Sequence, residues 1–377
     1  MSADDQPGVS SLSYDDSDLD DIGKLLENLN ITSVDEFLKQ YDYDHLFPPV
    51  VHHLSSSASI SLMVCYILIF CLGLIGNLLV IIVVAANRSM QTVTNVFIVS
   101  LAVSDVMISV LSVPFTLVEA ITAGWVMGLF MCKLVNFMTL LSAISSVLTL
   151  TCIAVDRYNA ICQPLKSRII HTTTRAAKLL CFVWSAAVIM ASPLLFVFEL
   201  HVVGEVRNDQ NYTLCQEMWR YPQQKMAFTF FLVAVTYLVP LGLMLFLYVR
   251  ICHHLWVRNP IGPTDLQQLN AVSTLKYKKK ATKMLVLVVV LFFICWTPYH
   301  VVTVRREFPS LKDNEKNRLL VACITLLALS NSCLNPIVYA FLNGNFKQSF
   351  VATLKCRKTK VSPINITQNV PLSGSNI

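Results

Sequence analysis

Seven long stretches with almost no charged residues constrain what this chain can fold into. Each contains the run of about 20 predominantly apolar residues that an α-helix needs to cross a lipid bilayer. Transmembrane β-strands are only about 10 residues long and alternate apolar with polar positions, so the length of these stretches predicts helices. The stretches lie at 54–87, 94–118 (interrupted by Asp105 alone), 134–155, 179–198, 226–249, 284–304 and 319–342.

The composition agrees with burial in lipid. Hydrophobic residues make up 55% of the 377 residues and charged residues 14%, against roughly 25% charged in soluble domains. The first 50 residues lack the apolar core of a cleavable signal peptide, so we expect the first helix to direct insertion. We predict an all-α membrane protein in four parts: an acidic extension at 1–54, a seven-helix bundle at 55–343, a membrane-surface helix at 344–356 and a tail at 357–377.

Lys and Arg residues indicate the orientation, because loops that face the cytoplasm carry an excess of them. If the amino terminus lies outside, the inward-facing loops and carboxyl tail hold 18 Lys and Arg residues against 2 Asp and Glu residues. The extension before the first helix then holds 12 acidic and 2 basic residues, with five Asp in the block YDDSDLDD at 14–21. This distribution predicts a multi-pass plasma-membrane protein with an extracellular amino terminus.

The acidic extension also carries two short amphipathic patterns. Apolar residues recur with helical spacing from Ile22 to Leu29 and again from Val34 to Tyr41. Two interpretations stay open. The extension is either disordered, because helices this short are marginal alone, or a short helix–turn–helix that docks on a cationic peptide and speeds its capture electrostatically.

A few residues on the predicted outer side carry covalent chemistry. Of the twelve cysteines, Cys132 at the outer start of the third helix and Cys215 in the second outer loop face the oxidising compartment. We therefore expect a disulfide between them. Asn30 and Asn211 lie in outer Asn-X-Thr sequons and are expected glycosylation sites.

Asp105 is the one acidic residue deep in a predicted helix. Ionisable groups inside a bilayer are costly and mark functional sites by default. Ser146, Asn331 and Asn335 are polar residues at a comparable depth in the third and seventh helices. The carboxyl group is either protonated and satisfied by neighbouring side chains, or it joins these oxygen atoms in binding a small cation such as sodium.

Short motifs follow one another along the predicted helices, and each one alone has a packing explanation. They are GN at 76–77, LAVSD at 101–105, DRY at 156–158, Trp184, Pro240, CWTP at 295–298 and NPIVY at 335–339. Taken together, over residues 55–356, they resemble the rhodopsin-like class of G-protein-coupled receptors.

This resemblance implies a mechanism and a set of partners. Asp156 would hold Arg157 at rest, and activation would release Arg157 to face a heterotrimeric G protein of the Gq or Gi/o type. Arrestin and a receptor kinase are implied as further partners. The residues implied in the switch are Asp156, Arg157, Tyr158, Tyr248 and Tyr339. Those implied in a sodium site, with no other cofactor expected, are Asp105, Ser146, Asn331 and Asn335.

Two residues that this chain lacks narrow the class of ligand. The seventh helix at 319–342 has no Lys, so a retinal Schiff base is excluded. Amine receptors of this class have Asp seven residues after the Cys of the third helix, where this chain has Thr139. Amine sensing is therefore disfavoured.

Acidic residues near the outer helix ends favour a basic ligand. Glu307 lies 11 residues after Trp296, about three turns and roughly 16 Å further along the same helix face. Thr116 and Glu119 lie at i, i+3 near the outer end of the second helix. Carboxylates at a pocket rim suit an arginine, whose guanidinium binds them bidentately. The alternative for Glu307 is a solvated loop acid.

Several stretches resemble neuropeptide receptors that recognise a carboxy-terminal Arg-Phe-amide, most closely the group for pyroglutamylated RF-amide peptides. They include TVTNVFIVSLAVSD, AGWVMGLFMCK, CWTPYHVV and SNSCLNPIVYAFLNGNFK. The resemblance implies that Glu307 contacts the peptide arginine, that Thr116 belongs to the same site and that Trp296 forms the pocket floor. The chain departs from that group at Thr139 and Glu119, where Gln is usual or frequent. Receptors of the neuropeptide FF, orexin and cholecystokinin type are the alternatives.

Three features remain. His300, one turn above Trp296, either lines the pocket or serves in packing. After the seventh helix, NGNFKQSFVATLKC predicts an amphipathic helix on the membrane, with Cys356 as a palmitoylation site. The run KYKKK at 276–280 fits contact with anionic lipid, and no nucleic acid is expected as a partner.

Two other classes of membrane protein were considered. A transporter would tend to show internal repeats, and an enzyme would show a catalytic motif. Neither feature is found, so a receptor is favoured over both.

Overall fold

The fold is described from a computed structural model, which describes residues 54–122, 124–164, 172–205, 210–257, 265–308 and 315–354. The predicted amino-terminal helices, Asn30 and Cys356 lie outside these ranges. Residues 52–202 and 212–377 form one compact unit, which contains all the helices described below. Within the described ranges, seven helical segments are long and apolar enough to cross a membrane, which confirms the prediction.

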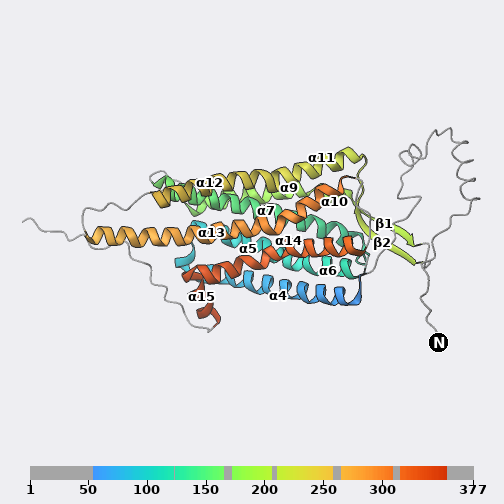
Figure 1. Ribbon diagram of the computed structural model, residues 1–377, viewed down its shortest axis with the longest axis horizontal. Helices are drawn as coiled ribbons and strands as arrows, with labels where there is room; N and C mark the ends of the chain where they lie inside the picture. The colour runs from blue at the N-terminus through green and yellow to red at the C-terminus, as the bar shows by residue number, and fades with distance from the viewer. Residues whose placement is uncertain are drawn as a thin grey trace, which may run out of the picture. The chain divides into compact units, whose positions relative to one another are not determined.

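The seven segments run side by side (Figure 1). They are α4 (Ser56–Ala86), α5 with α6 (Val93–Leu111 and Val113–Thr122), α7 (Gly128–Cys162), α9 with α10 (Thr173–Ala191 and Leu194–Val197), α11, η2 and α12 (Pro222–Val233, Ala234–Leu238 and Val239–Val257), α13 (Asp265–Arg306) and α14 (Glu315–Leu342). The helices are longer than the charge-free stretches of the sequence. The difference is largest for α13, whose helical backbone continues into polar residues on both sides of the stretch at 284–304.

Prolines explain two irregularities in these segments. Pro114 lacks the N–H that would bond to the carbonyl of Val110, and the helix is interrupted between α5 and α6 at Ser112. Pro240 likewise has no N–H to donate to the carbonyl of Thr236, and the preceding turn, η2, is π-helical. Pro298 lies inside α13, which continues through it.

A β-hairpin and a disulfide mark one end of the bundle. Strand β1 (Phe198–Glu205) pairs with β2 (Gln210–Glu217), and Asn211 lies in β2. Cys215 of β2 forms the predicted disulfide with Cys132 near the start of α7, with the two Cα atoms 5.8 Å apart. We call this the disulfide end. The opposite end carries the DRY residues and α15 (Gly344–Leu354), and we call it the α15 end.

Buried polar contacts and one close approach fix the helices against one another. Asn77 on α4 is fully buried, and its Nδ2 donates to the carbonyls of Gly73 and Ser332, each at 2.8 Å. The second bond joins α4 to α14. At Gly76, the residue before Asn77, an added Cβ would lie 2.8 Å from a side-chain carbon of Pro336, so only glycine allows this separation of the two helices.

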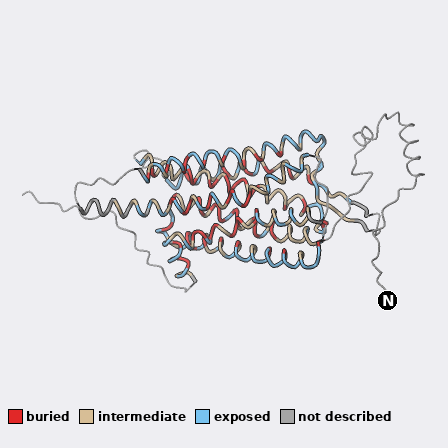
Figure 2. The backbone as a smooth tube through the Cα atoms, in the orientation of Figure 1, coloured by how far each residue is buried: buried red, intermediate tan, exposed pale blue. Residues whose placement is uncertain are grey.

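Burial follows the pattern of a bundle in lipid (Figure 2). Buried residues lie on the helix faces that meet. Large apolar side chains such as Phe182, Ile189 and Phe341 are exposed. Exposed apolar residues at this density suit contact with lipid chains. On α15, Phe346 and Phe350 are buried on one side, as the predicted amphipathic helix requires.

Candidate ligand pocket and switch

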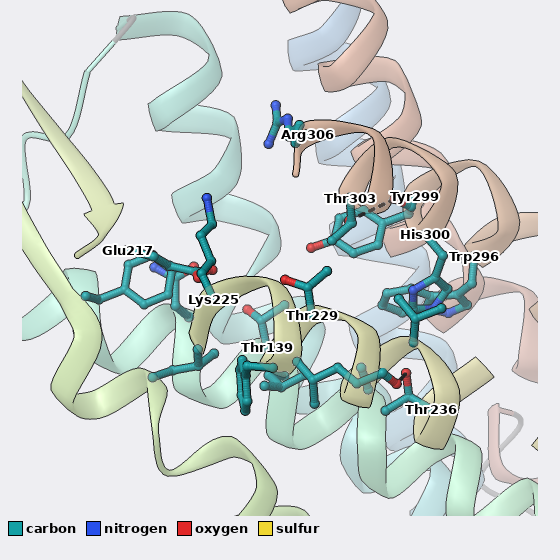
Figure 3. Close-up of a pocket in the computed structure, with 18 of the residues that line it drawn as sticks. Thr139, Glu217, Lys225, Thr229, Thr236, Trp296, Tyr299, His300, Thr303 and Arg306 are labelled. Carbon is teal, nitrogen blue, oxygen red and sulfur yellow. Dashed lines mark hydrogen bonds between the residues drawn. The ribbon is translucent and has the colours of Figure 1, made fainter. Parts of the chain in front are cut away.

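A cavity of about 560 Å³ lies at the disulfide end (Figure 3). Its walls come from α7, from the β1–β2 hairpin, from α11 with η2, and from α13. The walls combine apolar and polar side chains in similar measure, and a cavity of this size with convergent polar groups is typical of a ligand site.

Trp296 lies at the floor of this cavity, and His300 also lines it. The rings of Phe292, Tyr299 and His300 lie 5.9, 5.6 and 6.1 Å from the Trp296 ring. The indole Nε1 of Trp296 is buried and has no hydrogen-bond partner among the described residues. The floor is therefore an aromatic cluster with one unused donor.

Thr139 lines the cavity on α7, but its hydroxyl group is already engaged. Its Oγ1 donates to the carbonyl of Val135 at 2.7 Å and lies 2.6 Å from Oγ of Ser112, which lies between α5 and α6. Because the single hydroxyl hydrogen is used, Ser112 is the donor to Thr139. Thr139 retains one lone pair, with which it could accept a hydrogen bond from a ligand.

Glu307 follows α13 directly and does not line the cavity. Its Oε1 accepts a hydrogen bond of 3.1 Å from Oγ1 of Thr229, which does line it. The carboxylate is half-buried and held beside the cavity mouth. It is therefore fixed by α11 and is not a freely solvated loop acid.

Thr116 and Glu119 lie on α6, and neither lines this cavity. Glu119 is exposed, and Arg306 and Arg318 lie near enough for their charges to act on it. The charged residues that do line the cavity are Glu217, Lys225 and Arg306. The sequence analysis singled out none of the three as a site residue. Glu217 could have been placed near the cavity, because it lies two residues after the disulfide Cys215.

The residues of the predicted cation site are all buried, and one contact between them is seen. Asp105 is fully buried, and its Oδ2 accepts a hydrogen bond of 2.8 Å from Nδ2 of Asn335. Three oxygen atoms of these residues are buried without a partner among the described residues: Asp105 Oδ1, Ser146 Oγ and Asn331 Oδ1. One carboxyl group with neutral oxygens is a donor set for a hard monovalent cation. In the described ranges, no three His, Cys, Asp or Glu side chains come together as a metal site.

The DRY residues form a closed network at the α15 end. Nη2 of Arg157 lies 2.7 Å from Oδ2 of Asp156, and the side chains are 22% and 11% exposed. Thr94 on α5 joins this pair: its Oγ1 donates to Asp156 at 3.2 Å and accepts from Arg157. The pairing of Arg157 with Asp156 agrees with the implied resting state, and Thr94 is a member that sequence reasoning missed.

The three tyrosines of the predicted switch differ in their surroundings. Tyr158 is partly buried against the core. Tyr248 is buried, its hydroxyl has no partner among the described residues, and the Arg157 charge acts on it. Tyr339 is buried and stacks on Phe346 of α15, with ring centroids 5.6 Å apart.

Comparison with known proteins supplies the family. A family model described as 7 transmembrane receptor (rhodopsin family) matches residues 76–339. The chain is 43% identical over 350 residues to a QRFP-like peptide receptor of Branchiostoma floridae, covering 92% of this chain and 90% of that one. It is 35% identical over 340 residues to the pyroglutamylated RF-amide peptide receptor of Mus musculus, covering 88% and 77%. It is also 35% identical over 324 residues to galanin receptor 2b of Danio rerio, covering 83% and 81%.

Proposed function

Because this chain belongs to the rhodopsin family of seven-transmembrane receptors, we propose that it is activated by a neuropeptide ending in Arg-Phe-amide and signals through a heterotrimeric G protein. The family is a class of multi-pass plasma-membrane receptors and not of enzymes. The observation that carries the ligand assignment is a fixed carboxylate, Glu307, beside the mouth of a cavity whose floor is the aromatic cluster around Trp296. The relatives named as RF-amide peptide receptors support it.

The arginine of an Arg-Phe-amide fits the mouth of the cavity, and the phenylalanine fits the floor. The guanidinium pairs with Glu307, whose position is fixed by Thr229. The phenylalanine ring reaches the apolar and aromatic lining nearer the floor, where Phe292, Trp296 and Leu232 lie. Burying an aromatic side chain among aromatic rings adds favourable edge-to-face contacts to the hydrophobic gain.

The terminal amide is held by acceptors on α7 in place of the Gln that is usual in RF-amide receptors. Thr139 offers a lone pair, and Asn136 uses its Nδ2 for the carbonyl of Cys132, which leaves its Oδ1 free to accept. The charged lining residues are Glu217, Lys225 and Arg306, and none lies near Trp296 at the floor (Figure 3). A free carboxylate there would be desolvated without a cation beside it, so the amidated peptide is preferred.

Activation is a shift between two states of the bundle. The agonist binds the open state better than the closed one, and the difference in binding free energy sets the size of the shift. In the closed state Asp156 and Thr94 hold Arg157. On opening, Arg157 leaves them, and Tyr248 and Tyr339 turn towards it, so that the α15 end receives a G protein of the Gq or Gi/o type.

The proposal extends to the sodium ion and the remaining partners. Asp105, Ser146, Asn331 and Asn335 would hold sodium, which supplies a positive charge to the buried carboxyl group and favours the closed state. The amino terminus is extracellular, with glycans on Asn30 and Asn211 and a palmitoyl chain on Cys356. Thr116 and Glu119 contact parts of the peptide outside the cavity. Arrestin and a receptor kinase act at the α15 end.

The ligand assignment is tested with three peptides on cells that express the receptor. The peptides are an RF-amide, its free acid and its Arg→Ala form, and the readouts are calcium and cAMP. Glu307→Gln is compared with wild type, and Glu199→Gln, an exposed acid on β1, is the matched control. Loss of a charge-assisted hydrogen bond costs about 1.5–3 kcal/mol, so Glu307→Gln should reduce the potency of the RF-amide by roughly 10- to 100-fold.

One result overturns the ligand assignment and leaves the family membership intact. It is the absence of any response to RF-amide peptides while the receptor is at the cell surface. The ligand would then be another basic or amidated neuropeptide, of the neuropeptide FF, orexin or cholecystokinin type. Similarity to galanin receptor 2b makes a non-RF-amide neuropeptide the second candidate.

A further inference from the structure

Three lysines at the α15 end of the α13 span lie on one face of that helix. Lys276, Lys280 and Lys283 are exposed and follow the spacing i, i+4, i+7. At 3.6 residues per turn, this spacing keeps the three side chains in one row. The same spacing continues into the span with exposed apolar residues, which are Leu287, Val290, Ile294 and Val301. The lysine row therefore lies on the lipid-facing side of α13.

The opposite face of α13 packs into the bundle. Leu285, Val289 and Phe292 on that face are buried. Lys278 is exposed but lies seven residues before Leu285, which puts it in register with the buried face. The helix thus divides the basic run at 276–280 between two faces, with Lys278 on the bundle-facing one.

The neighbouring helix α12 contributes an aromatic ring to the lipid-facing side. Trp256 is exposed and lies seven residues after Val249 and eleven after Leu245, which are also exposed. Trp is enriched where a helix leaves the bilayer. Nζ of Lys279 lies 5.1 Å from the centre of the Trp256 ring. An ammonium group on a ring face keeps N–H donors for an anion. We call Trp256, Lys279, Lys280 and Lys283 the tryptophan–lysine surface.

This surface lies at the depth of the lipid headgroups. Lys283 directly precedes the charge-free stretch that begins at residue 284. With a rise of 1.5 Å per residue, Lys280 and Lys279 lie about 4.5 to 6 Å further out. The headgroup layer on each side of the hydrocarbon core is about 5 to 8 Å thick. All three ammonium groups therefore fall within it, whereas Lys276 lies about 10 Å out, at its edge.

The positive charge of the surface is not balanced by the protein. Residues 251–283 contain a single acidic residue, Asp265. Among the described residues, the lysines of the surface form no salt bridge, and Asp156 is already paired with Arg157. Basic residues next to a membrane attract anionic lipids, and each adds to the attraction.

We propose that the tryptophan–lysine surface binds an anionic phospholipid whose headgroup carries several phosphates, as in an inositol bisphosphate lipid. Three ammonium groups at one depth match several phosphates, each of which accepts charge-assisted hydrogen bonds. The acyl chains lie along the exposed apolar rows of α12 and α13. The occupant is a lipid and not a protein, because the lysines continue the lipid-facing rows of both helices.

The test measures lipid binding to the purified full chain in detergent micelles. The probe is a short-chain phosphatylinositol bisphosphate, titrated against receptor that carries a fluorescent label. Two further ligands separate the parts of the lipid: inositol trisphosphate, which lacks the acyl chains, and phosphatidylserine with the same short chains. Lys280→Gln is compared with the matched control Lys278→Gln, which removes the same charge two residues away on the other face. Gel filtration checks that each variant is folded.

The expected result is a loss that depends on the face of the helix. Lys280→Gln should weaken binding of the inositol lipid about 5-fold, and the double variant Lys280→Gln, Lys283→Gln roughly 10- to 30-fold. Lys278→Gln should change it less than about 2-fold. Wild type should bind the inositol lipid at least about 10-fold more tightly than phosphatidylserine or inositol trisphosphate.

Three results overturn the inference. They are absence of binding to wild type, an equal loss in Lys278→Gln and Lys280→Gln, and equal affinity for the inositol lipid and inositol trisphosphate. The second result would mean a general attraction to positive charge, and the third a site for a soluble phosphate.

A second variant tests the contribution of α12. Trp256→Leu keeps an apolar side chain for contact with lipid but removes the ring that holds Lys279. Binding of the inositol lipid should weaken about 2- to 5-fold. An unchanged affinity overturns the assignment of the site to both helices.

Discussion

Thr94 joins both members of the Arg157–Asp156 pair, so replacing it with Val tests whether this network holds the closed state. Its hydroxyl donates to Asp156 and accepts from Arg157. Val has nearly the same shape and lacks the hydroxyl, so the substitution removes both hydrogen bonds with little change in packing. The expected effect is a higher signal in the absence of ligand.

The magnitude follows from the burial of the network. The Arg157 and Asp156 side chains are 22% and 11% exposed, so hydrogen bonds to them fall between exposed and fully buried values. Losing them should destabilise the closed state by about 1–2 kcal/mol, or roughly 5- to 30-fold in the ratio of open to closed receptor. A receptor that is about 1% open would become about 5–20% open.

The assay is ligand-free binding of a non-hydrolysable GTP analogue to membranes with G protein, at equal receptor density. Thr151→Val is the control, because Thr151 lies on α7 but donates only to Val147 of its own helix. Thr94→Val should raise basal exchange several-fold while Thr151→Val leaves it near wild type. Equal basal exchange in the two variants would refute the role given to Thr94.

The remaining predictions concern other parts of the bundle. Asn77→Ala removes two buried hydrogen bonds to carbonyl oxygens and should cost about 2 kcal/mol, read as a lower Tm of the receptor in detergent. Asp105→Asn should abolish the effect of sodium on agonist affinity, measured by binding in sodium against choline; a retained sodium effect would exclude this site. Phe346→Ala opens a cavity under Tyr339 and Phe350 and should destabilise α15 by about 3 kcal/mol, seen as faster amide exchange in that helix alone.

The fold was predictable because a bilayer imposes length and apolarity on every crossing segment. The seven spans were confirmed for this reason. The disulfide between Cys132 and Cys215 was confirmed because the predicted topology left these two cysteines on the oxidising side, and the buried face of α15 because its sequence is amphipathic. Trp296 and His300 line the cavity because both stand on one face of a long helix, where helical spacing is enough to place them.

The contacts between distant segments were not predictable. Thr94 lies 62 residues before Asp156, and no pattern in the sequence links the two. Thr116 and Glu119 have the expected spacing on α6, yet they do not line the cavity, because the interruption at Ser112 and the packing of α6 decide where they point. Glu217 lies in a hairpin, where helical periodicity says nothing about direction.

The most direct test of the central claim is G-protein activation by a defined peptide on membranes that contain this receptor. Exchange of a labelled GTP analogue is measured with an RF-amide peptide and with its free acid, against membranes without receptor. The account predicts saturable activation by the amide, with the free acid at least about 10-fold weaker because its carboxylate meets no cation at the cavity floor. Equal activation by both forms, or by neither, would contradict it.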